Sequence, residues 1–349
     1  MLRDANGSAL RAALLAAGVV AAVLTGVSRP AQALVIDPLF DSSVTAQQQS
    51  VIDTAIGFYE QSFVDPITVY IEFMTTTSGN FAGQSYSTDY RVPYASYASA
   101  LGLDAYSNSS AIGMDAYASL SHGNTASNVQ FSSADGRALG CGGCAPMLAG
   151  QGSVSSSTLL DGIVTVNSAY YGDNGAMVLH EVDEVLGIGG GGSVLPSLPA
   201  TNGSVIGPMD LFRYSGIDTP SLTTSPTAAA YFSLNAGATA IAGFNQSGTG
   251  DYGDFTTSSC YVQSASLCGS PTISLTSPEG LALQAIGYDA VPEPAGLAVL
   301  GSAVAGLGLA LRRRSARGQR AQDRGRLTLG QHRKAGGDRV GEVVRIDQV

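Results

Sequence analysis

The segment Ala176–Gly192, AMVLHEVDEVLGIGGGG, constrains what this chain can fold into and bind more than any other stretch. Its apolar spacing predicts a helix over residues 175–186, followed at once by glycines that end it. Residues four apart lie on one side of a helix, so His180 and Glu184 can face the same ion. Glu181 lies beside them and is placed to polarise a metal-bound water.

The pattern is the H-E-x-x-H motif of zinc proteases with Glu184 at the second histidine position. A catalytic zinc normally takes three protein ligands and a water. Besides His180 the chain has only His122, in a polar stretch, and His332, near the C-terminus. The third-ligand position of the metzincin pattern falls on Gly190, which has no side chain. The third ligand is therefore expected to be a carboxylate.

Asp210, 26 residues after Glu184, is the first choice for that third ligand, and Asp251 and Asp254 are weaker choices. One histidine with two carboxylates makes an oxygen-rich site, so zinc is expected but manganese or iron would also fit. Two carboxylates would neutralise the charge of the ion and leave less of it to acidify a bound water. The alternatives are a charged helix face around His180 and a turn-stabilising role for Asp210.

The glycines after the helix, Gly187–Gly192, formally fit the dinucleotide-binding pattern G-x-G-x-x-G. That pattern must follow a strand and open a helix, and here it follows a helix. We therefore reject a dinucleotide site and expect a flexible loop beside the predicted metal site.

The N-terminus, residues 1–33, has the layout of a secretory signal peptide. Arg3 and Arg11 precede the apolar run Ala12–Val27, and Ala31-Gln32-Ala33 supplies an A-x-A cleavage site for signal peptidase. The run is short for a membrane span, so cleavage is favoured over an uncleaved anchor.

A second predicted targeting segment lies near the C-terminus, between residues 291 and 314. Val291-Pro292-Glu293-Pro294 precedes the apolar stretch Ala295–Leu311, which three arginines close, as in a short span with its basic end in the cytoplasm. This ending resembles the PEP-CTERM sorting signal of Gram-negative bacteria. The resemblance implies processing by an exosortase and delivery to the cell surface, outer membrane or extracellular matrix; a plain stop-transfer anchor is the alternative. Residues 315–349 form a basic tail without periodicity, which predicts disorder.

The remaining span, residues 34–290, is strongly acidic and is expected to form one domain. It holds three basic residues, Arg91, Arg137 and Arg213, and 21 acidic ones, a formal net charge of −18. Such a surface repels nucleic acid and anionic membranes, so membrane contact is expected only through the C-terminal segment. Arg213 is expected to pair with a structural carboxylate.

All four cysteines lie in this span, as Cys141-Gly-Gly-Cys144 and as Cys260 and Cys268. Four cysteines allow three pairings, and two local disulfides are the simplest prediction for an exported protein. A redox role for C-G-G-C would need a βαβ pattern around it, and a four-cysteine zinc site would need a second C-x-x-C.

Hydrophobic periodicity predicts alternating helices and strands in the acidic span, with long Gly/Ser-rich loops between them. The expected helices are residues 45–63, 94–103, 175–186 and 278–286. The expected strands are residues 67–73, 161–168, 229–234 and 241–244. Residues 74–90 and 107–158 are expected to lack regular structure, because they are rich in serine and glycine.

Several segments together resemble a family of exported PEP-CTERM proteins classed as metalloproteases, in which an H-E-x-x-E helix precedes a D-L-F-R-Y-S segment. The matching segments are LHEVDEVLG, PMDLFRYS, AAYFSLNAG, GDYGDF and LQAIGYDAVPEP. The resemblance implies a zincin-like α+β fold, with the active-site helix packed on a small mixed sheet. It implies His180 and Glu184 as ligands and Glu181 as general base, and makes Asp210 and Tyr214 site candidates. Tyr214 would donate a hydrogen bond to a developing oxyanion, or else be a core tyrosine.

The sequence thus predicts an exported zinc-dependent peptidase that hydrolyses peptide bonds of a peptide or protein substrate through a metal-activated water. The alternative is a non-enzymatic surface or matrix protein that holds at most a structural ion. Its acidic, Ser/Thr/Gly-rich composition and its sorting signal fit that alternative equally well.

Overall fold

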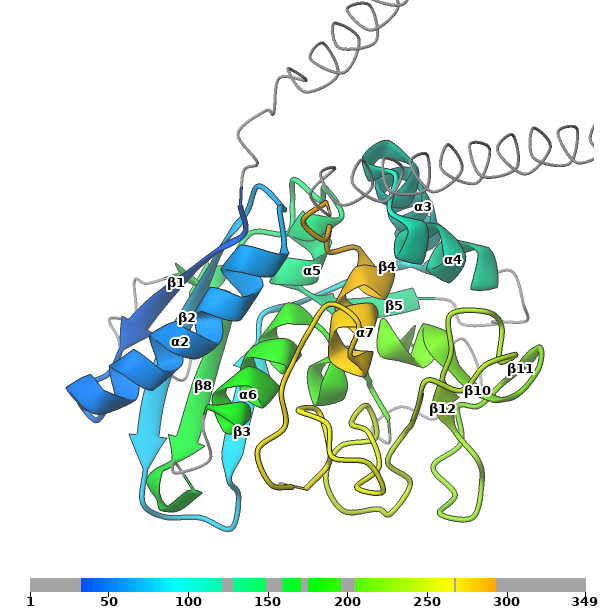
Figure 1. Ribbon diagram of the computed structural model, residues 1–349. Coiled ribbons are helices and arrows are strands. Elements are labelled where there is room, and N and C mark those ends of the chain that lie inside the picture. Colours follow the sequence, from blue (N-terminus) through cyan, green and yellow to red (C-terminus); the bar gives the residue numbers. More distant parts are fainter. Residues whose placement is uncertain are drawn as a thin grey trace, which may run out of the picture. The chain divides into compact units, whose positions relative to one another are not determined.

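The computed structural model has a mixed α and β architecture around a four-stranded sheet (Figure 1). It describes residues 33–120, 128–148, 159–170, 175–195, 205–266 and 268–292. The sheet has the order β1-β2-β8-β3, which are Val35–Phe40, Thr68–Thr76, Gly162–Asn167 and Gly83–Ser87. The first three strands are parallel, and β3 runs antiparallel to β8 at one edge.

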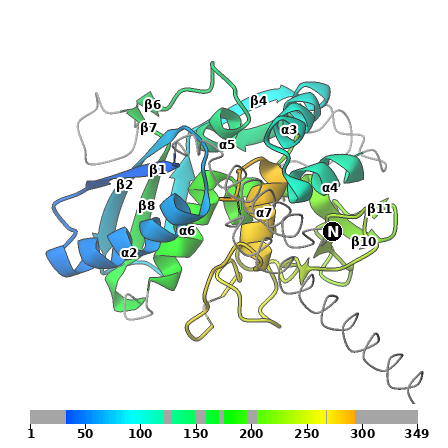
Figure 2. The same cartoon turned by 45° about the horizontal axis from the view of Figure 1, so that its top comes forward.

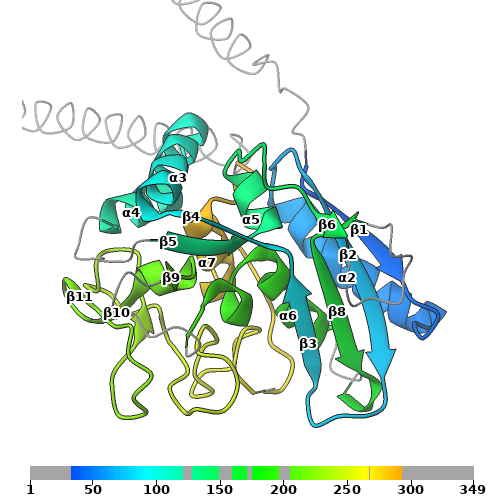
Figure 3. The ribbon, with the colours of Figure 1, turned by 180° about the vertical axis from the view of Figure 1, so that it is seen from behind.

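Two helices, α2 (Ala46–Ser62) and α6 (Ala176–Leu186), lie side by side on one face of this sheet (Figures 1 and 3). Thr45 caps the start of α2 and forms a reciprocal capping box with Gln48. The buried Tyr59 hydroxyl lies 2.9 Å from the Leu179 carbonyl and 2.8 Å from Asp183 Oδ1. This contact fixes α6 against α2.

Glycines bring α6 close to the sheet. A Cβ at Gly162 would overlap the Val185 side chain, and one at Gly83 would overlap Glu181 Oε1 and Met177 Sδ. Both strands can therefore approach the helix only because these positions lack side chains. The helix ends at Gly187, which adopts the left-handed conformation (φ 107°) expected of a glycine that ends a helix.

The remaining elements pack beside this layer, with α7 (Pro278–Ile286) next to α4 (Ala111–Ser119) (Figure 2). The other helices are α3 (Tyr94–Asn108) and α5 (Ser133–Ala138). A three-stranded sheet has the order β4-β5-β9, which are Asp89–Pro93, Asn128–Ser132 and Val205–Ile206. A four-stranded sheet has the order β11-β10-β12-β13, which are Thr219–Pro220, Arg213–Gly216, Tyr231–Phe232 and Ala242–Gly243. Short 3-10 helices are η1 (Ser168–Tyr170), η2 (Gly189–Gly192) and η3 (Met209–Phe212), and β6 (Met147–Leu148) pairs with β7 (Leu159–Leu160).

A continuous apolar core joins the sheet, the helices and the C-terminal half. Tyr288, directly after α7, is buried and donates a hydrogen bond to the Leu186 carbonyl at the end of α6. Its ring packs edge-on against Phe63. The hydrogen bond from Tyr288 therefore ties the end of the site helix to the segment after α7.

The prediction of two local disulfides is confirmed, as Cys141–Cys144 and Cys260–Cys268. The predicted signal peptide lies outside the described residues except for Ala33, as does the predicted sorting signal beyond Pro292. Within the described part, no helix is both long and apolar enough to cross a membrane.

The expected α+β class is confirmed at that coarse level, and the elements around the site helix were placed well. The prediction that residues 74–90 lack regular structure is wrong, because β3 and the start of β4 lie there. The sequence of β3, GQSYS, has no β-branched residue; its pairing with β8 decides its conformation instead. The prediction for residues 107–158 is also wrong, because that stretch holds α4, β5 and α5.

Candidate metal centre

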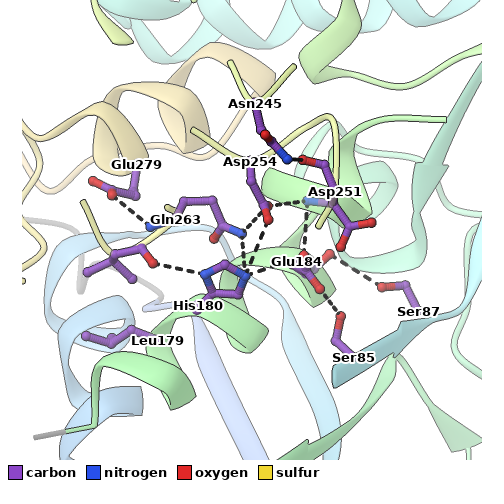
Figure 4. A network of polar contacts seen from close by, with 12 residues as sticks. Ser85, Ser87, Leu179, His180, Glu184, Asn245, Asp251, Asp254, Gln263 and Glu279 are labelled. Atoms are coloured by element: carbon purple, nitrogen blue, oxygen red, sulfur yellow. Dashed lines mark hydrogen bonds and ion pairs between the residues drawn. The ribbon is translucent and has the colours of Figure 1, made fainter. Parts of the chain in front are cut away.

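His180 lies at the centre of a polar group formed between α6 and the segment that follows Asp251 (Figure 4). Its Nδ1 is 2.9 Å from the Val262 carbonyl, which can only accept, so Nδ1 carries a proton and donates. Its Nε2 therefore faces two carboxylates, Glu184 Oε1 at 3.8 Å and Asp254 Oδ2 at 3.9 Å. A backbone carbonyl that holds Nδ1–H in this way orients the imidazole for a ligand at Nε2.

Glu184, one helical turn after His180, is held on both carboxylate oxygens. Ser85 Oγ on β3 donates to Oε2 at 2.6 Å, and the Gly190 N–H donates to Oε1 at 3.1 Å. The Ser87 hydroxyl donates to the backbone carbonyl of Glu184. The edge strand thus orients the glutamate that replaces the second histidine of the motif.

Asp254 completes the group from the loop after β13. Its Oδ1 accepts hydrogen bonds from the Gly190 N–H at 3.1 Å and from Gln263 Nε2 at 2.9 Å. The other oxygen, Oδ2, remains directed at His180. The Gly190 N–H is therefore shared between the carboxylates of Glu184 and Asp254 and keeps them near each other.

One nitrogen and two carboxylate oxygens of these residues lie within 4.8 Å of one another. Zinc binds such atoms at about 2.0–2.2 Å, so two ligands of one ion can be at most about 4.4 Å apart. The 3.8 and 3.9 Å separations from His180 fall inside that limit. Among the described residues, this is the one group of three or more such side chains that could hold an ion.

The charges of the group favour a cation at this position. Burial lowers the pKa of His180, but the carboxylates of Asp254, Glu184 and Glu181 outweigh it and raise that pKa to about 10. Burial raises the pKa of Glu184 to about 7 and raises that of Asp254 as well. The lone pair of His180 Nε2 can bind a proton, accept a hydrogen bond from the Gln263 side chain or coordinate a metal ion. The carboxylates of Glu184 and Asp254 favour a positive charge at this position.

Glu181 lies beside the ligand group and is buried, with 3% of its surface exposed. Its Oε1 is next to Gly83 of β3, and its Oε2 has no hydrogen-bond partner among the described residues. Burial and the Glu184 carboxylate hold the pKa of Glu181 well above its usual range. A buried carboxylate oxygen without a partner is costly unless a water, a substrate or an ion completes it.

The glycine run after α6 is closely packed, contrary to the predicted flexible loop. Gly189–Gly192 forms the 3-10 helix η2. A Cβ at Gly190 would lie 2.5 Å from Glu184 Oε1 and 2.7 Å from Asp251 Oδ2, and one at Gly189 would overlap Gln263. These glycines therefore allow the backbone to pass between the carboxylates and to donate an N–H to them.

Asp210 does not join the ligand group in this structure. Its oxygens accept hydrogen bonds from Ser193 Oγ at 2.7 Å, from the Val194 N–H at 3.2 Å and from the Gly207 N–H at 2.9 Å. The first-choice third ligand of the sequence analysis is thus occupied in holding a turn, and Asp254, a weaker choice, takes its place. The spacing of 26 residues gave no information about which way the side chain points.

Tyr214 and Arg213 also have structural positions. Tyr214 is buried and donates to the Ser119 carbonyl at 3.1 Å, as in the alternative of a core tyrosine. Arg213 donates to the Tyr252 carbonyl at 2.6 Å and to Gln246, and its guanidinium lies 4.4 Å from the Phe244 ring centre. Burial lowers the pKa of Arg213 to about 10, against the opposing effect of the Asp210 carboxylate.

Gln263 and Glu279 were not anticipated as parts of the site. Gln263 is fully buried, bonds to Asp254 and lies 3.2 Å from His180 Nε2. Its own N–H donates to Glu279 Oε1 on α7 at 3.0 Å (Figure 4). Gln263 lies in a stretch without hydrophobic periodicity, and Glu279 lies in the first turn of a helix. Nothing in the sequence around either residue indicates that it contacts the site.

Comparisons with protein-family models, curated proteins and solved structures found no match to this chain. An open depression of about 680 Å³ lies between β12, β13 and residues 245–249, and its lining does not include His180, Glu184 or Asp254.

Proposed function

We propose that this protein is an exported metal-dependent peptidase, most simply a zinc enzyme, in which His180, Glu184 and Asp254 hold the ion. The observation that carries the proposal is that one nitrogen and two carboxylate oxygens of these residues lie within 4.8 Å of one another, with His180 anchored through Nδ1. Asp254 replaces Asp210 in the proposed ligand set, because the oxygens of Asp210 already accept hydrogen bonds from Ser193, Val194 and Gly207. The zincin-like fold and the delivery to the cell surface belong to the same proposal.

The donor set fits a divalent cation, because among the basic side chains that the structure describes in residues 34–290 only His180, when protonated, could otherwise bring positive charge to the buried carboxylates. The three arginines of this span bind other groups. Arg91 donates a hydrogen bond to Gln130, Arg137 forms an ion pair with Asp161, and Arg213 donates a hydrogen bond to the Tyr252 carbonyl. No other arginine or lysine exists between residues 34 and 290. Buried carboxylates without a cation are strongly destabilising, so an ion at this point would remove a large cost. One nitrogen with two oxygens suits zinc and also admits manganese or iron.

A bound ion would supply Lewis acidity, which lowers the pKa of a water and polarises a peptide carbonyl. The protein supplies the base: Glu181 takes a proton from the attacking water on its unpartnered Oε2 and passes it to the leaving amine. Ser85 and the Gly190 N–H keep Glu184 in place during this transfer. Two carboxylate ligands make a weaker acid of the water than two histidines would, so we expect modest turnover.

The edge strand β3 supports a peptide as the substrate. Among the described strands, β3 pairs only with β8, so its other edge can accept an extended chain. The strand passes Glu181 at Gly83 and Glu184 at Ser85. A peptide added along β3 would therefore run past the proposed base.

A non-enzymatic protein with a structural ion is the second candidate, and one observation favours it. The side chains of His180, Glu184 and Asp254 are only 13%, 8% and 4% exposed. A structural ion needs no opening for a substrate, whereas a peptidase does.

Metal analysis of the purified protein, paired with the variant Glu181→Gln, separates these functions. A peptidase binds one ion per chain and cleaves a broad peptide library, and Glu181→Gln keeps the ion but loses cleavage by about 100-fold or more. Glu60→Gln, at a carboxylate on α2 that bonds to the Ile36 N–H, is the matched control and should change neither property. Bound metal without any cleavage would favour the structural candidate, and protein that binds no metal would contradict both.

A further inference from the structure

Asp251 is the exposed member of the acidic group around the proposed ion. Its Oδ2 lies 2.7 Å from the position of a Cβ on Gly190, on the side of that glycine that also meets Glu184 (Figure 4). Unlike Glu181, Glu184 and Asp254, it is exposed to solvent. It also lies outside the group of ligand atoms that are within 4.8 Å of one another. Asp251 therefore borders the site without belonging to the ligand set.

The backbone holds Asp251 in place, while its carboxylate remains available. Asn245 Nδ2 donates to the Asp251 carbonyl at 3.0 Å, and the Asp254 N–H donates to the same oxygen at 3.4 Å. Within the part of the chain that the structure describes, no hydrogen bond or ion pair reaches the carboxylate of Asp251. The loop thus presents an exposed carboxylate beside the site.

The site remains negative even when an ion is bound. With a neutral His180 and all four carboxyl groups deprotonated, the two positive charges of the ion meet the carboxylates of Glu181, Glu184, Asp251 and Asp254, which leaves a formal charge of −2. The three arginines of the acidic span are engaged elsewhere. Independently, the buried Oε2 of Glu181 has no hydrogen-bond partner among the described residues, so it can accept a hydrogen bond from a further ligand.

We propose that Asp251 selects cationic peptides, by pairing with a positive group of the substrate next to the bond that is cleaved. The positive group is either the free α-ammonium of the peptide or the side chain of a lysine or arginine. This inference rests on the proposed function, because it names the substrate class of the same site. An anionic site that attracts cationic ligands speeds their association at low salt, and added salt weakens this effect.

The test measures peptide binding by zinc-loaded and zinc-free protein alongside cleavage. The probes are short peptides of alanine, leucine and serine that carry either one lysine or one glutamine, each with a free or an acetylated N-terminus. Wild-type protein should prefer the lysine or the free-amine peptides by about 5-fold, as expected for an exposed ion pair of about 1 kcal/mol. Comparison of the acetylated peptides and the glutamine peptides with the others shows whether Asp251 recognises the α-ammonium group or the lysine side chain.

The variant Asp251→Asn should lose this preference while zinc affinity and cleavage of the neutral peptides stay within about 2-fold of wild type. Asp53→Asn, at an exposed carboxylate of α2, is the matched control and should keep the preference. A preference that persists in Asp251→Asn, or a wild type that treats neutral and cationic peptides alike, overturns the proposal. Zinc affinity weakened 10-fold or more in Asp251→Asn also overturns it, because Asp251 would then be a ligand.

The two proposals fail separately. Cleavage without charge preference refutes only the role of Asp251. Binding of cationic peptides that depends on Asp251, with no cleavage of any peptide, supports the selectivity and contradicts the peptidase.

Discussion

Replacement of Gly190 by alanine tests the centre of the site with one methyl group. Gly190 donates its N–H to both Glu184 and Asp254, and its backbone does not need a positive φ. Alanine can therefore adopt the same backbone conformation. Any effect of Gly190→Ala must come from the added Cβ and its contacts with the carboxylates.

The size of the effect follows from two distances. The new Cβ would lie 2.5 Å from Glu184 Oε1 and 2.7 Å from Asp251 Oδ2, where ordinary contacts begin at 3.4 Å. Glu184 Oε1 must therefore retreat by about 0.9 Å, which is close to half of a zinc–oxygen bond of about 2.0–2.2 Å. We expect zinc affinity to fall by about 10- to 100-fold, as for lost orienting contacts. Overpacking should lower the free energy of unfolding by about 1–3 kcal/mol.

The assay is competition for zinc against a chromophoric chelator, with thermal unfolding of the ion-free protein measured alongside. Gly142→Ala is the matched control, because a Cβ there meets nothing within 4 Å. It should leave zinc affinity unchanged. Wild-type zinc affinity in Gly190→Ala would refute the placement of Glu184 and Gly190 around a common ion.

Two further predictions concern residues outside the ligand set. Glu279→Leu removes the acceptor of the Gln263 N–H and should weaken zinc binding by about 10-fold, whereas Glu279→Gln keeps an acceptor and should retain affinity, as measured by the same competition. Burial and the Asp289 carboxylate raise the pKa of Asp65 from 3.8 to about 8. The folded state then holds this proton more tightly than the unfolded state, so its contribution to stability is full below pH 3.8 and is lost as pH rises through about 8. The melting temperature should therefore fall over that range and fall less in Asp65→Asn; an equal fall in both proteins would contradict the assignment.

The site helix could be predicted from the sequence because its information is local. The apolar spacing, the pair His180 and Glu184, and the terminal Gly187 all act within one helix, and the structure places them as expected. The last helix, α7, was equally clear, and its predicted limits match the observed ones. Local periodicity and end signals suffice for such elements.

The third residue of the proposed ligand group, Asp254, could not be predicted, because its position depends on how distant segments pack. Asp210 and Asp254 are both aspartates in glycine-containing stretches, and only the hydrogen bonds to Gly207 and Val194 show that Asp210 is already occupied. The role of Gln263 depends on its placement 83 residues after His180. Sequence spacing indicates which side chains share a helix face. It does not indicate which of several distant residues will meet that face in the folded chain.

The edge strand failed for a different reason. Gly83 and Ser85 are poor strand formers, yet the first lets β3 approach Glu181 and the second holds Glu184. Composition therefore suggested a loop where the site needs small residues. Local preference and function conflict at this strand, as is common at functional sites.

The wide separation of the proposed ligands along the chain would link folding to the choice of metal. An unfolded chain carries His180 and Glu184 on one short segment, far from Asp254 and from the Val262 carbonyl that orients the imidazole in the folded protein. Because two ligands on a flexible segment hold an ion weakly, metal would be acquired only after the C-terminal half has closed over α6. Transition-metal affinities follow a fixed order that a site of this kind cannot reverse, so the compartment in which folding ends would decide which ion is bound.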